Sequence, residues 1–250
     1  MNLVDNATVR RAVADFVSRP EQRTAIEVLR SCMYGELLLD LTGSDMPVDG
    51  SFVRGSRIQI REGTGPDGGR ALFVFTRQEE IARLYPPDTQ TQSMVTPAAA
   101  ALGLAQHQKA AWLYIDPAGP TCALSAAEIE FALSSPNNEP LKTALAALDA
   151  GQVDRLNVLE VLRQDGPLLL GAAAESVGGK TAVRSTVLAD GRPALIGFTS
   201  APEVVAFNPS DAAVVLTTLQ VLELVRRDGY SGIVVNPAGP SIAFSRAEVG

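Results

Sequence analysis

The chain of 250 residues has 28 acidic and 21 basic side chains, a formal net charge of −7, and 46% hydrophobic residues. This composition is typical of a globular protein with a sizeable core. The acidic balance disfavours nucleic acid as a partner, because phosphate binding needs a concentrated basic surface. One histidine, His107, and two cysteines, Cys32 and Cys122, are too few for a structural zinc cluster, a multi-histidine metal site or a disulfide scaffold.

The sequence predicts no membrane insertion. The N-terminus has no basic segment followed by an apolar core and a cleavage site, so no signal peptide is expected. The weakly polar stretches at 94–105 and 167–174 are too short to cross a bilayer. We therefore expect a cytoplasmic protein in which both cysteines remain reduced thiols.

The first half of the chain predicts helices followed by strands and further helices. The expected elements, in chain order, are helices at 9–17 and 21–31, a strand at 37–39, a hairpin of strands 57–61 and 71–75, a helix at 97–110 and a strand at 111–115. Thr76 follows the second hairpin strand and could cap the next helix. A Ser-x-x-Glu capping box that starts at Ser125 opens a last helix.

The second half predicts the same layout. Its expected elements are helices at 141–150 and 154–164, a strand at 168–170, a hairpin that turns at Asp190-Gly191, a helix at 212–228 and a strand at 232–235. Thr199 occupies the position of Thr76, and a second capping box starts at Ser245.

The two halves are copies of one unit. Residues 113–120 read LYIDPAGP and residues 233–240 read IVVNPAGP, and the match continues on both sides. Turn-forming residues at 134–140 separate the copies. We therefore predict an α+β protein of two tandem αβ repeats, residues 1–134 and 140–250, each with a mixed β-sheet flanked by helices.

The recurring features make the chain resemble a known family. The Phe-Thr strand ends at 75–76 and 198–199, the Asp/Asn-Pro-Ala-Gly-Pro turns and the Ser-x-x-Glu helix starts resemble the SseB family. That family is known from bacterial "enhanced serine sensitivity" proteins and is common in actinobacterial genomes. The resemblance is strongest at 69–131 and 191–249. It implies the repeated fold and a non-catalytic role, and it assigns no catalytic residue or cofactor.

Two glycine-rich segments imitate nucleotide-binding motifs. Residues 174–181 fit a relaxed phosphate-loop pattern, in which Lys180 would contact phosphates and Thr181 a magnesium ion. The following segment is rich in β-branched residues, which predicts a strand rather than the helix that a phosphate loop requires. Residues 63–68 formally satisfy G-x-G-x-x-G, but strands are predicted on both sides, so this segment is a hairpin loop.

The other reactive side chains favour structural roles. His107 lies near a helix end, and no nucleophile or carboxylate is placed beside it. Cys122 corresponds to Ile242 in the second copy, which indicates a small core residue. Glu79 and Glu80 are expected as helix-start charges. We therefore expect no enzyme activity, no metal and no cofactor.

The two Pro-Ala-Gly-Pro turns remain as candidate binding sites. Their residues are Asp116, Pro117 and Gly119 in the first copy and Asn236, Pro237 and Gly239 in the second. A structural interpretation is a tight connection, in which proline fixes the backbone and glycine supplies a conformation that other residues avoid. A functional interpretation is a paired rim of two loops presented to a partner.

Three functions remain open. The first is a non-catalytic protein-interaction module, such as an adaptor, a secretion-associated protein or a toxin-neutralising partner. The second is a sensor that binds an amino acid or another small metabolite between the two repeats. The third is an ATPase that uses Lys180 and Thr181. The duplicated scaffold, the acidic balance and the lack of a catalytic set favour the first, with a protein as the expected partner.

Overall fold

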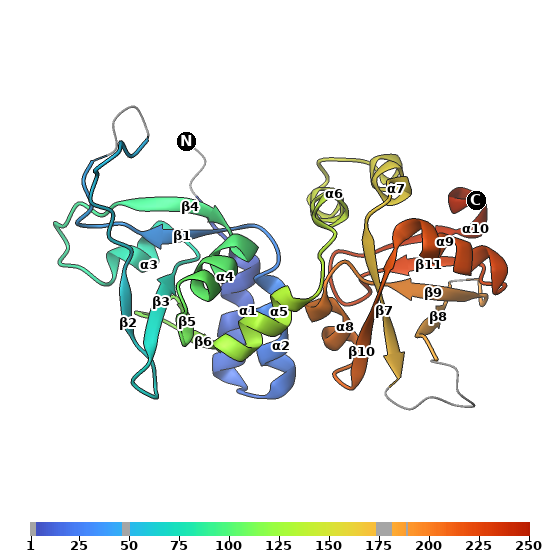
Figure 1. The fold of residues 1–250 in the computed structure, drawn as a ribbon, viewed down its shortest axis with the longest axis horizontal. Helices are drawn as coiled ribbons and strands as arrows, with labels where there is room; N and C mark the ends of the chain where they lie inside the picture. Colours follow the sequence, from blue (N-terminus) through green and yellow to red (C-terminus); the bar gives the residue numbers. More distant parts are fainter. Residues whose placement is uncertain (1–3, 47–50, 174–181, 189) are drawn as a thin grey trace. The chain divides into compact units, whose positions relative to one another are not determined.

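The computed structural model describes residues 4–46, 51–173, 182–188 and 190–250. The chain divides into two compact units, Met1–Glu130 and Phe131–Gly250, called unit 1 and unit 2 below. Both units combine helices with strands, and helices flank their sheets (Figure 1), which confirms the predicted α+β class.

Unit 1 has a four-stranded mixed sheet and a two-stranded sheet. Its elements are α1 (Ala7–Ser18), α2 (Gln22–Ser31), β1 (Glu36–Asp40), β2 (Glu62–Thr64), β3 (Arg70–Val74), α3 (Gln78–Ala82), β4 (Ser93–Pro97), α4 (Ala98–His107), β5 (Trp112–Ile115), β6 (Cys122–Ser125) and α5 (Ala126–Ser134), which continues into unit 2. The mixed sheet has the order β2-β3-β5-β6, with β3 and β5 parallel. β1 pairs with β4 and is joined to the end of β3 by a bridge between Leu38 and Phe75.

Unit 2 repeats this topology. Its elements are α6 (Glu139–Asp149), α7 (Arg155–Arg163), β7 (Pro167–Ala173), β8 (Ser185–Val187), β9 (Pro193–Gly197), α8 (Ala201–Phe207), β10 (Asp211–Thr217), α9 (Thr218–Arg227), β11 (Gly232–Val235), β12 (Ile242–Ser245) and α10 (Arg246–Val249). The mixed sheet has the order β12-β11-β9-β8, with β9 and β11 parallel. β7 pairs with β10, and a bridge joins Leu169 to Phe198. The two units therefore have the same strand order, as expected for two copies of one sequence unit.

Mainly aliphatic side chains form the core in both units. In unit 2, Leu145 and Leu162 from the first two helices pack in one cluster with Ile233 and Phe244 from the mixed sheet. Full burial of such a side chain stabilises the fold by about 1.5–3 kcal/mol. The helices are therefore held to the sheets mainly by burial of their apolar faces.

Both predicted capping boxes are confirmed. The Glu128 carboxylate accepts a hydrogen bond from the Ser125 backbone N–H at 2.7 Å, and Glu248 accepts the same bond from Ser245 at 2.7 Å. These bonds satisfy backbone donors that the first turn of a helix leaves free. The local Ser-x-x-Glu signal therefore places the starts of α5 and α10 correctly.

The first hairpin strand lies further along the chain than predicted. The sequence predicts it at 57–61, whereas β2 begins at Glu62. Pairing extends backward only a short way from the turn at 65–69, because the preceding residues bond elsewhere. The Arg57 N–H, for example, donates to the Asp45 carboxylate at 2.7 Å. This long-range contact is absent from the local pattern on which the prediction rested.

The helix predicted at 212–228 is wrong in its first part. Residues 211–217 form β10, which pairs with β7 along its whole length, and α9 begins at Thr218. Thr217 caps that helix, since its side chain accepts a hydrogen bond from the Gln220 N–H. A short apolar run fits a buried strand and a buried helix equally well by periodicity, so pairing with β7 decides between them.

Candidate functional site

The Asp-Pro-Ala-Gly-Pro turn of unit 1 connects β5 to β6. Asp116 has a φ of 52°, in the left-handed region that aspartate and asparagine enter more readily than most residues. The Asp116 N–H donates to the Val74 carbonyl, and the Gly119 N–H donates to the Asp116 carbonyl, both at 3.0 Å. The Thr121 hydroxyl donates to the Ile115 carbonyl at 2.7 Å. Both ends of the turn are thereby fixed to the sheet.

The corresponding turn of unit 2 has the same conformation. Asn236 has a φ of 50°, its N–H donates to the Gly197 carbonyl, and the Gly239 N–H donates to the Asn236 carbonyl, both at 3.0 Å. The Ser241 hydroxyl donates to the Val235 carbonyl at 3.1 Å. The two copies therefore present one turn shape, each within its own unit.

The first residue of each turn is a buried anchor. Asp116 accepts two hydrogen bonds from Thr76, at 2.9 Å from the backbone N–H and at 2.7 Å from the hydroxyl. Asn236 accepts from the Thr199 N–H at 2.9 Å, but its amide Nδ2 donates to the Thr199 hydroxyl oxygen at 2.8 Å. The exchange of Asp for Asn reverses one hydrogen bond and leaves the geometry unchanged.

These bonds overturn the helix caps predicted for Thr76 and Thr199. The N-cap residues are Arg77 for α3 and Ser200 for α8. Both threonine side chains are fully buried and face the anchor residues. A threonine directly before a helix predicts a cap for that helix, but both threonines bond instead to residues far along the chain.

In each unit, a buried asparagine before the first helix is hydrogen-bonded to the threonine that contacts the turn anchor. Asn6 is the N-cap of α1, and its backbone N–H donates to the Thr76 carbonyl at 2.9 Å. Asn138 is the N-cap of α6, and its N–H donates to the Thr199 carbonyl at 3.0 Å. Neither asparagine was predicted, although an asparagine just before a helix is a recognisable capping signal.

Asp116 has a strongly perturbed acidity. Burial raises the pKa of its carboxyl from 3.8 to about 6, against the hydrogen bonds from Thr76, which lower it. The negative charge of Glu80 raises the pKa further, and Arg10 lowers it. Asn236 holds the same position in unit 2 with an amide, which carries no charge at any pH in this range.

A buried carboxylate from α3 lies against the turn of unit 1. The Glu80 side chain is 3% exposed and binds the guanidinium groups of Arg77 and Arg83. A Cβ on Gly119 would come within 2.8 Å of Arg83 Nη1, so glycine permits this close approach. Glu80 does lie in the first turn of α3 as predicted, but its ion pairs were missed. The Arg-x-x-Glu-x-x-Arg spacing, which places all three on one helix face, could have indicated them.

The tips of the two turns reach the surface. Ala118 and Ala238 are exposed, while Pro117 and Pro237 are half-buried. The candidate residues therefore divide into buried anchors, Asp116 and Asn236, and the surface residues that these anchors hold in place. Each turn consists of a small apolar tip on a rigid support.

The phosphate-loop candidate lies outside the described residues. This applies to Lys180, Thr181 and the whole segment 174–181. The described chain resumes at residue 182, forms a bridge from Val183 to Ala172 and continues into β8. A strand therefore follows the segment, as predicted. The other glycine-rich segment lies in the β2–β3 hairpin, also as predicted.

The two cysteines are buried, and the histidine is exposed at a helix end. Cys32 and Cys122 are free and buried, and burial raises the pKa of both thiols, that of Cys122 to about 12. Cys122 is therefore a core residue, as predicted. His107 is the last residue of α4 and is exposed. Within the described ranges, no three His, Cys, Asp or Glu side chains gather as metal ligands, and no helix is long and apolar enough to cross a membrane.

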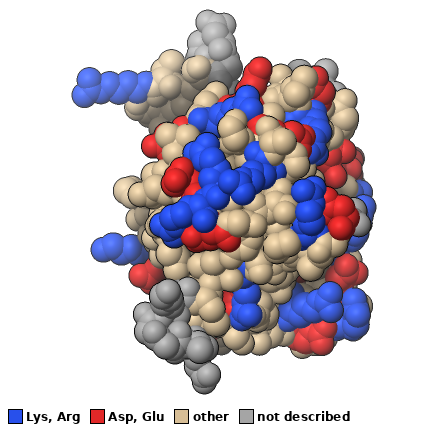
Figure 2. All heavy atoms as spheres, turned by 90° about the vertical axis from the view of Figure 1, so that its right-hand side faces the viewer, with Lys and Arg blue, Asp and Glu red and all other residues tan. Residues whose placement is uncertain are grey.

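Basic and acidic side chains lie close together on the surface of unit 2. Figure 2 shows lysine and arginine side chains grouped on one face, with aspartate and glutamate beside them. Arg155 pairs with Glu248 at 2.8 Å, and Arg226 pairs with Glu223 at 3.3 Å. These pairs compensate much of the positive charge locally.

The fold and the turns define a protein built from two copies of one αβ domain. The sequence matches the family described as SseB protein N-terminal domain at residues 9–130 and again at 141–250. The chain therefore belongs to the SseB family and carries two tandem copies of this domain, which confirms the resemblance seen in its motifs. No curated protein and no solved structure matches the chain.

Proposed function

We propose that the chain is a non-catalytic protein-interaction module, in which the Pro-Ala-Gly-Pro tips contact a protein partner. The observation that carries this proposal is that equivalent positions of the two turns hold an aspartate, Asp116, and an asparagine, Asn236. The φ angles of 52° and 50° and the 2.9 Å bonds from the threonine N–H groups persist, although only the aspartate can transfer a proton. A general acid or base loses its chemistry when an amide replaces the carboxylate, whereas a presented shape does not.

The exposed tips suit recognition by a protein surface. Ala118 and Ala238 project small side chains, so a partner can approach the backbone closely. The anchors hold the turns in one conformation before binding, which reduces the entropy lost when a complex forms. Loops on a rigid scaffold are a common location for binding sites.

The charge of the chain favours a partner with a basic surface. A net charge of −7 attracts positively charged partners over long range and speeds their encounter. An adaptor, a secretion-associated protein and a toxin-neutralising protein would all use such a surface without a catalytic group. We place this interaction in the cytoplasm, where the buried thiols stay reduced.

Capture from a lysate of the source organism tests the proposal. The tagged parent protein is compared with Ala118→Arg, Ala238→Arg and the double variant, which enlarge the exposed tips. Val17→Arg is the matched control, since Val17 is 51% exposed on α1 and away from both turns in sequence. We expect a protein that the parent and the control enrich reproducibly and that the double variant loses. Equal enrichment by all variants, or no reproducible protein, would contradict the proposal.

A further inference from the structure

β10 is an open edge strand of unit 2. It pairs with β7 on one side (Figure 1), and no strand in the described part of the chain pairs with its other side. In an antiparallel ladder, successive residues direct their N–H and C=O groups alternately toward the partner strand and away from it. Every second residue of β10 therefore directs its backbone groups outward.

The outward-facing residues are Ala213 and Val215. Val215 lies opposite Leu169, whose N–H and C=O groups both bond to Phe198 and so point away from β10. Ala213 lies opposite Gly171, whose carbonyl is also hydrogen-bonded on the side away from β10. Among the described residues, the backbone groups of Ala213 and Val215 have no hydrogen-bond partner. Two N–H and two C=O groups are therefore open along this edge.

Local hydrogen bonds close both ends of this opening. The Asp211 N–H donates to the Asn208 carbonyl at 3.1 Å, and the Thr217 N–H donates to the Gln220 side chain at 2.9 Å. Residues 212–216 read AAVVL and pair with β7 in one continuous register, so they contain no charge, no proline and no bulge. Natural proteins usually protect an exposed edge with one of these features, because an open edge invites pairing. The edge of β10 lacks this protection.

The equivalent edge in unit 1 is protected. Val95 of β4 holds the ladder position that Val215 holds in β10, and the two side chains are 51% and 45% exposed. However, β4 has five residues against seven in β10, and it ends at Pro97, which has no N–H. Asp5 and Glu36 line the space beside that end. Proline and charge both discourage the pairing of a further strand, so the open edge is a feature of unit 2.

An apolar groove lies at the end of the open edge. Its volume is about 410 Å³, and its apolar walls are formed by Pro136, Pro167, Val215 and Leu216. Asp165 is the charged residue of the lining, and it is exposed. A polypeptide that pairs with the edge can therefore place an apolar side chain in the groove and a basic side chain beside Asp165.

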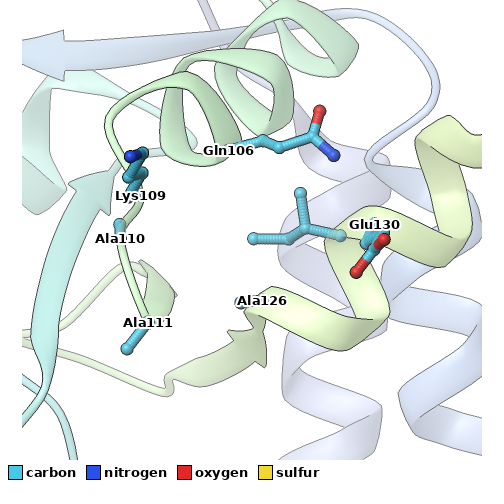
Figure 3. Close-up of a pocket in the computed structure, with 7 residues that line it drawn as sticks. Gln106, Lys109, Ala110, Ala111, Ala126 and Glu130 are labelled. Atoms are coloured by element: carbon cyan, nitrogen blue, oxygen red, sulfur yellow. The ribbon is translucent and has the colours of Figure 1, made fainter.

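The cavity at the end of α4 in unit 1 differs from this groove. Figure 3 shows Lys109 and Glu130 on its two sides, with Ala110 and Ala111 along its wall. These alanines lead into β5, which pairs with β3 on one side and with β6 on the other. That cavity therefore adjoins a closed part of its sheet, whereas the groove in unit 2 adjoins open backbone groups.

The size and charge of the edge favour an extended peptide over a second copy of the chain. A strand of seven residues is about 24 Å long. The strip along its edge is one strand wide, far less than the roughly 800 Å² per partner that a stable interface between folded proteins buries. The net charge of −7 also opposes association of two copies. An extended peptide needs only the edge and the groove, and a basic residue complements Asp165.

We propose that β10 binds an extended peptide segment of another protein, which adds a strand to the sheet. The peptide exchanges backbone hydrogen bonds with Ala213 and Val215, and these bonds supply affinity without regard to sequence. The groove selects an apolar side chain, and Asp165 selects a lysine or arginine near it. The site lies within unit 2 and does not involve the turn tips, so it is a second binding surface beyond the proposed function.

Selection from a phage-displayed library of random linear peptides tests this proposal on the full chain. Enriched sequences are expected to alternate apolar residues with others and to carry a lysine or arginine. Val215→Lys puts a charge on the open edge, and it is expected to weaken binding of a synthetic enriched peptide by about tenfold or more in fluorescence polarisation. Val95→Lys is the matched control in unit 1 and is expected to bind as the parent does. Asp165→Asn is expected to weaken binding by about threefold and to make it less sensitive to salt.

Amide hydrogen exchange measured by NMR distinguishes strand addition from binding in the groove alone. The peptide is expected to slow exchange of the Ala213 and Val215 N–H groups by about tenfold or more. The N–H groups of Val214 and Leu216 already face β7 and should change less. N-methylation of alternate amides of the peptide should abolish binding in one register and preserve it in the other, which tests the backbone bonds without any change to the protein.

An enriched peptide that Val215→Lys loses and that protects both outward amides would support the site. No enriched peptide, equal binding to Val215→Lys with a parent-like Tm, or unprotected amides would overturn it. A dimer in light scattering that Val215→Lys abolishes would identify a second copy as the occupant and overturn the peptide. The double variant of Ala118→Arg and Ala238→Arg is expected to bind the peptide as the parent does, so this proposal and the tip contacts fail separately.

Discussion

The anchor of the first turn makes a direct prediction about stability and pH. Asp116→Asn places in unit 1 the side chain that unit 2 already has at this position. The amide is expected to accept from the Thr76 N–H and to donate to the Thr76 hydroxyl oxygen, as Asn236 does with Thr199. The substitution should therefore keep the turn and remove the titrating group.

The expected change in the free energy of unfolding follows from the pKa of Asp116 in the folded state. A pKa raised from 3.8 to about 6 means that the folded state favours the protonated carboxyl. The stability that the protonated Asp116 carboxyl contributes is complete below pH 3.8 and is lost as the pH rises through 6. The shift of Asp116 corresponds to about 3 kcal/mol in the free energy of unfolding. We expect Asp116→Asn to match the parent near pH 3.5 and to be more stable by about 3 kcal/mol near pH 7.5.

Urea unfolding followed by tryptophan fluorescence measures this difference in the stability of unit 1. Trp112 is the only tryptophan of the chain and lies in β5, directly before the turn. Asn236→Asp is the reciprocal variant in unit 2, which lacks tryptophan, so its unfolding is followed by far-UV circular dichroism, and its loss of stability should grow as the pH rises. A constant difference between parent and Asp116→Asn from pH 3.5 to pH 7.5 would refute this account of the anchor.

Other predictions concern the core and the sheets. Cys32 and Cys122 should resist a thiol reagent at pH 8 in the native protein, because both thiols are buried with raised pKa values, and both should react in denaturant; rapid native labelling would contradict this. Gly232→Ala should lower the free energy of unfolding by about 3 kcal/mol, because its Cβ would lie 2.1 Å from the Phe244 carbonyl oxygen. Gly103→Ala in α4 has open space, so it should be neutral or stabilising by up to about 1 kcal/mol, and equal losses in urea unfolding of both variants would argue against the steric explanation.

The features predicted correctly from sequence depend on local signals. Apolar residues at helical spacing located the first two helices of each unit, and Ser-x-x-Glu located the starts of α5 and α10. The repeated Pro-Ala-Gly-Pro turn predicted the duplication, because two similar chains adopt similar turns. Each of these sequence patterns lies within a few residues of the helix or turn that it predicts.

The features that were missed depend on distant partners. β10 is a strand because β7 lies beside it, and the start of β2 depends on contacts to residues 44–45. Thr76 meets Asp116 only after β3 and β5 pair in parallel, so its role could not be read from its neighbours.

The turns are proposed to act through their shape and not through a reactive group. Capture at pH 7.5 with Asp116→Asn beside Ala118→Arg, each in the Ala238→Arg background to remove the second tip, measures this directly. The account predicts that Asp116→Asn keeps the partner protein and that Ala118→Arg loses it. Loss of the partner with Asp116→Asn and its retention with Ala118→Arg would show that the carboxylate carries the function.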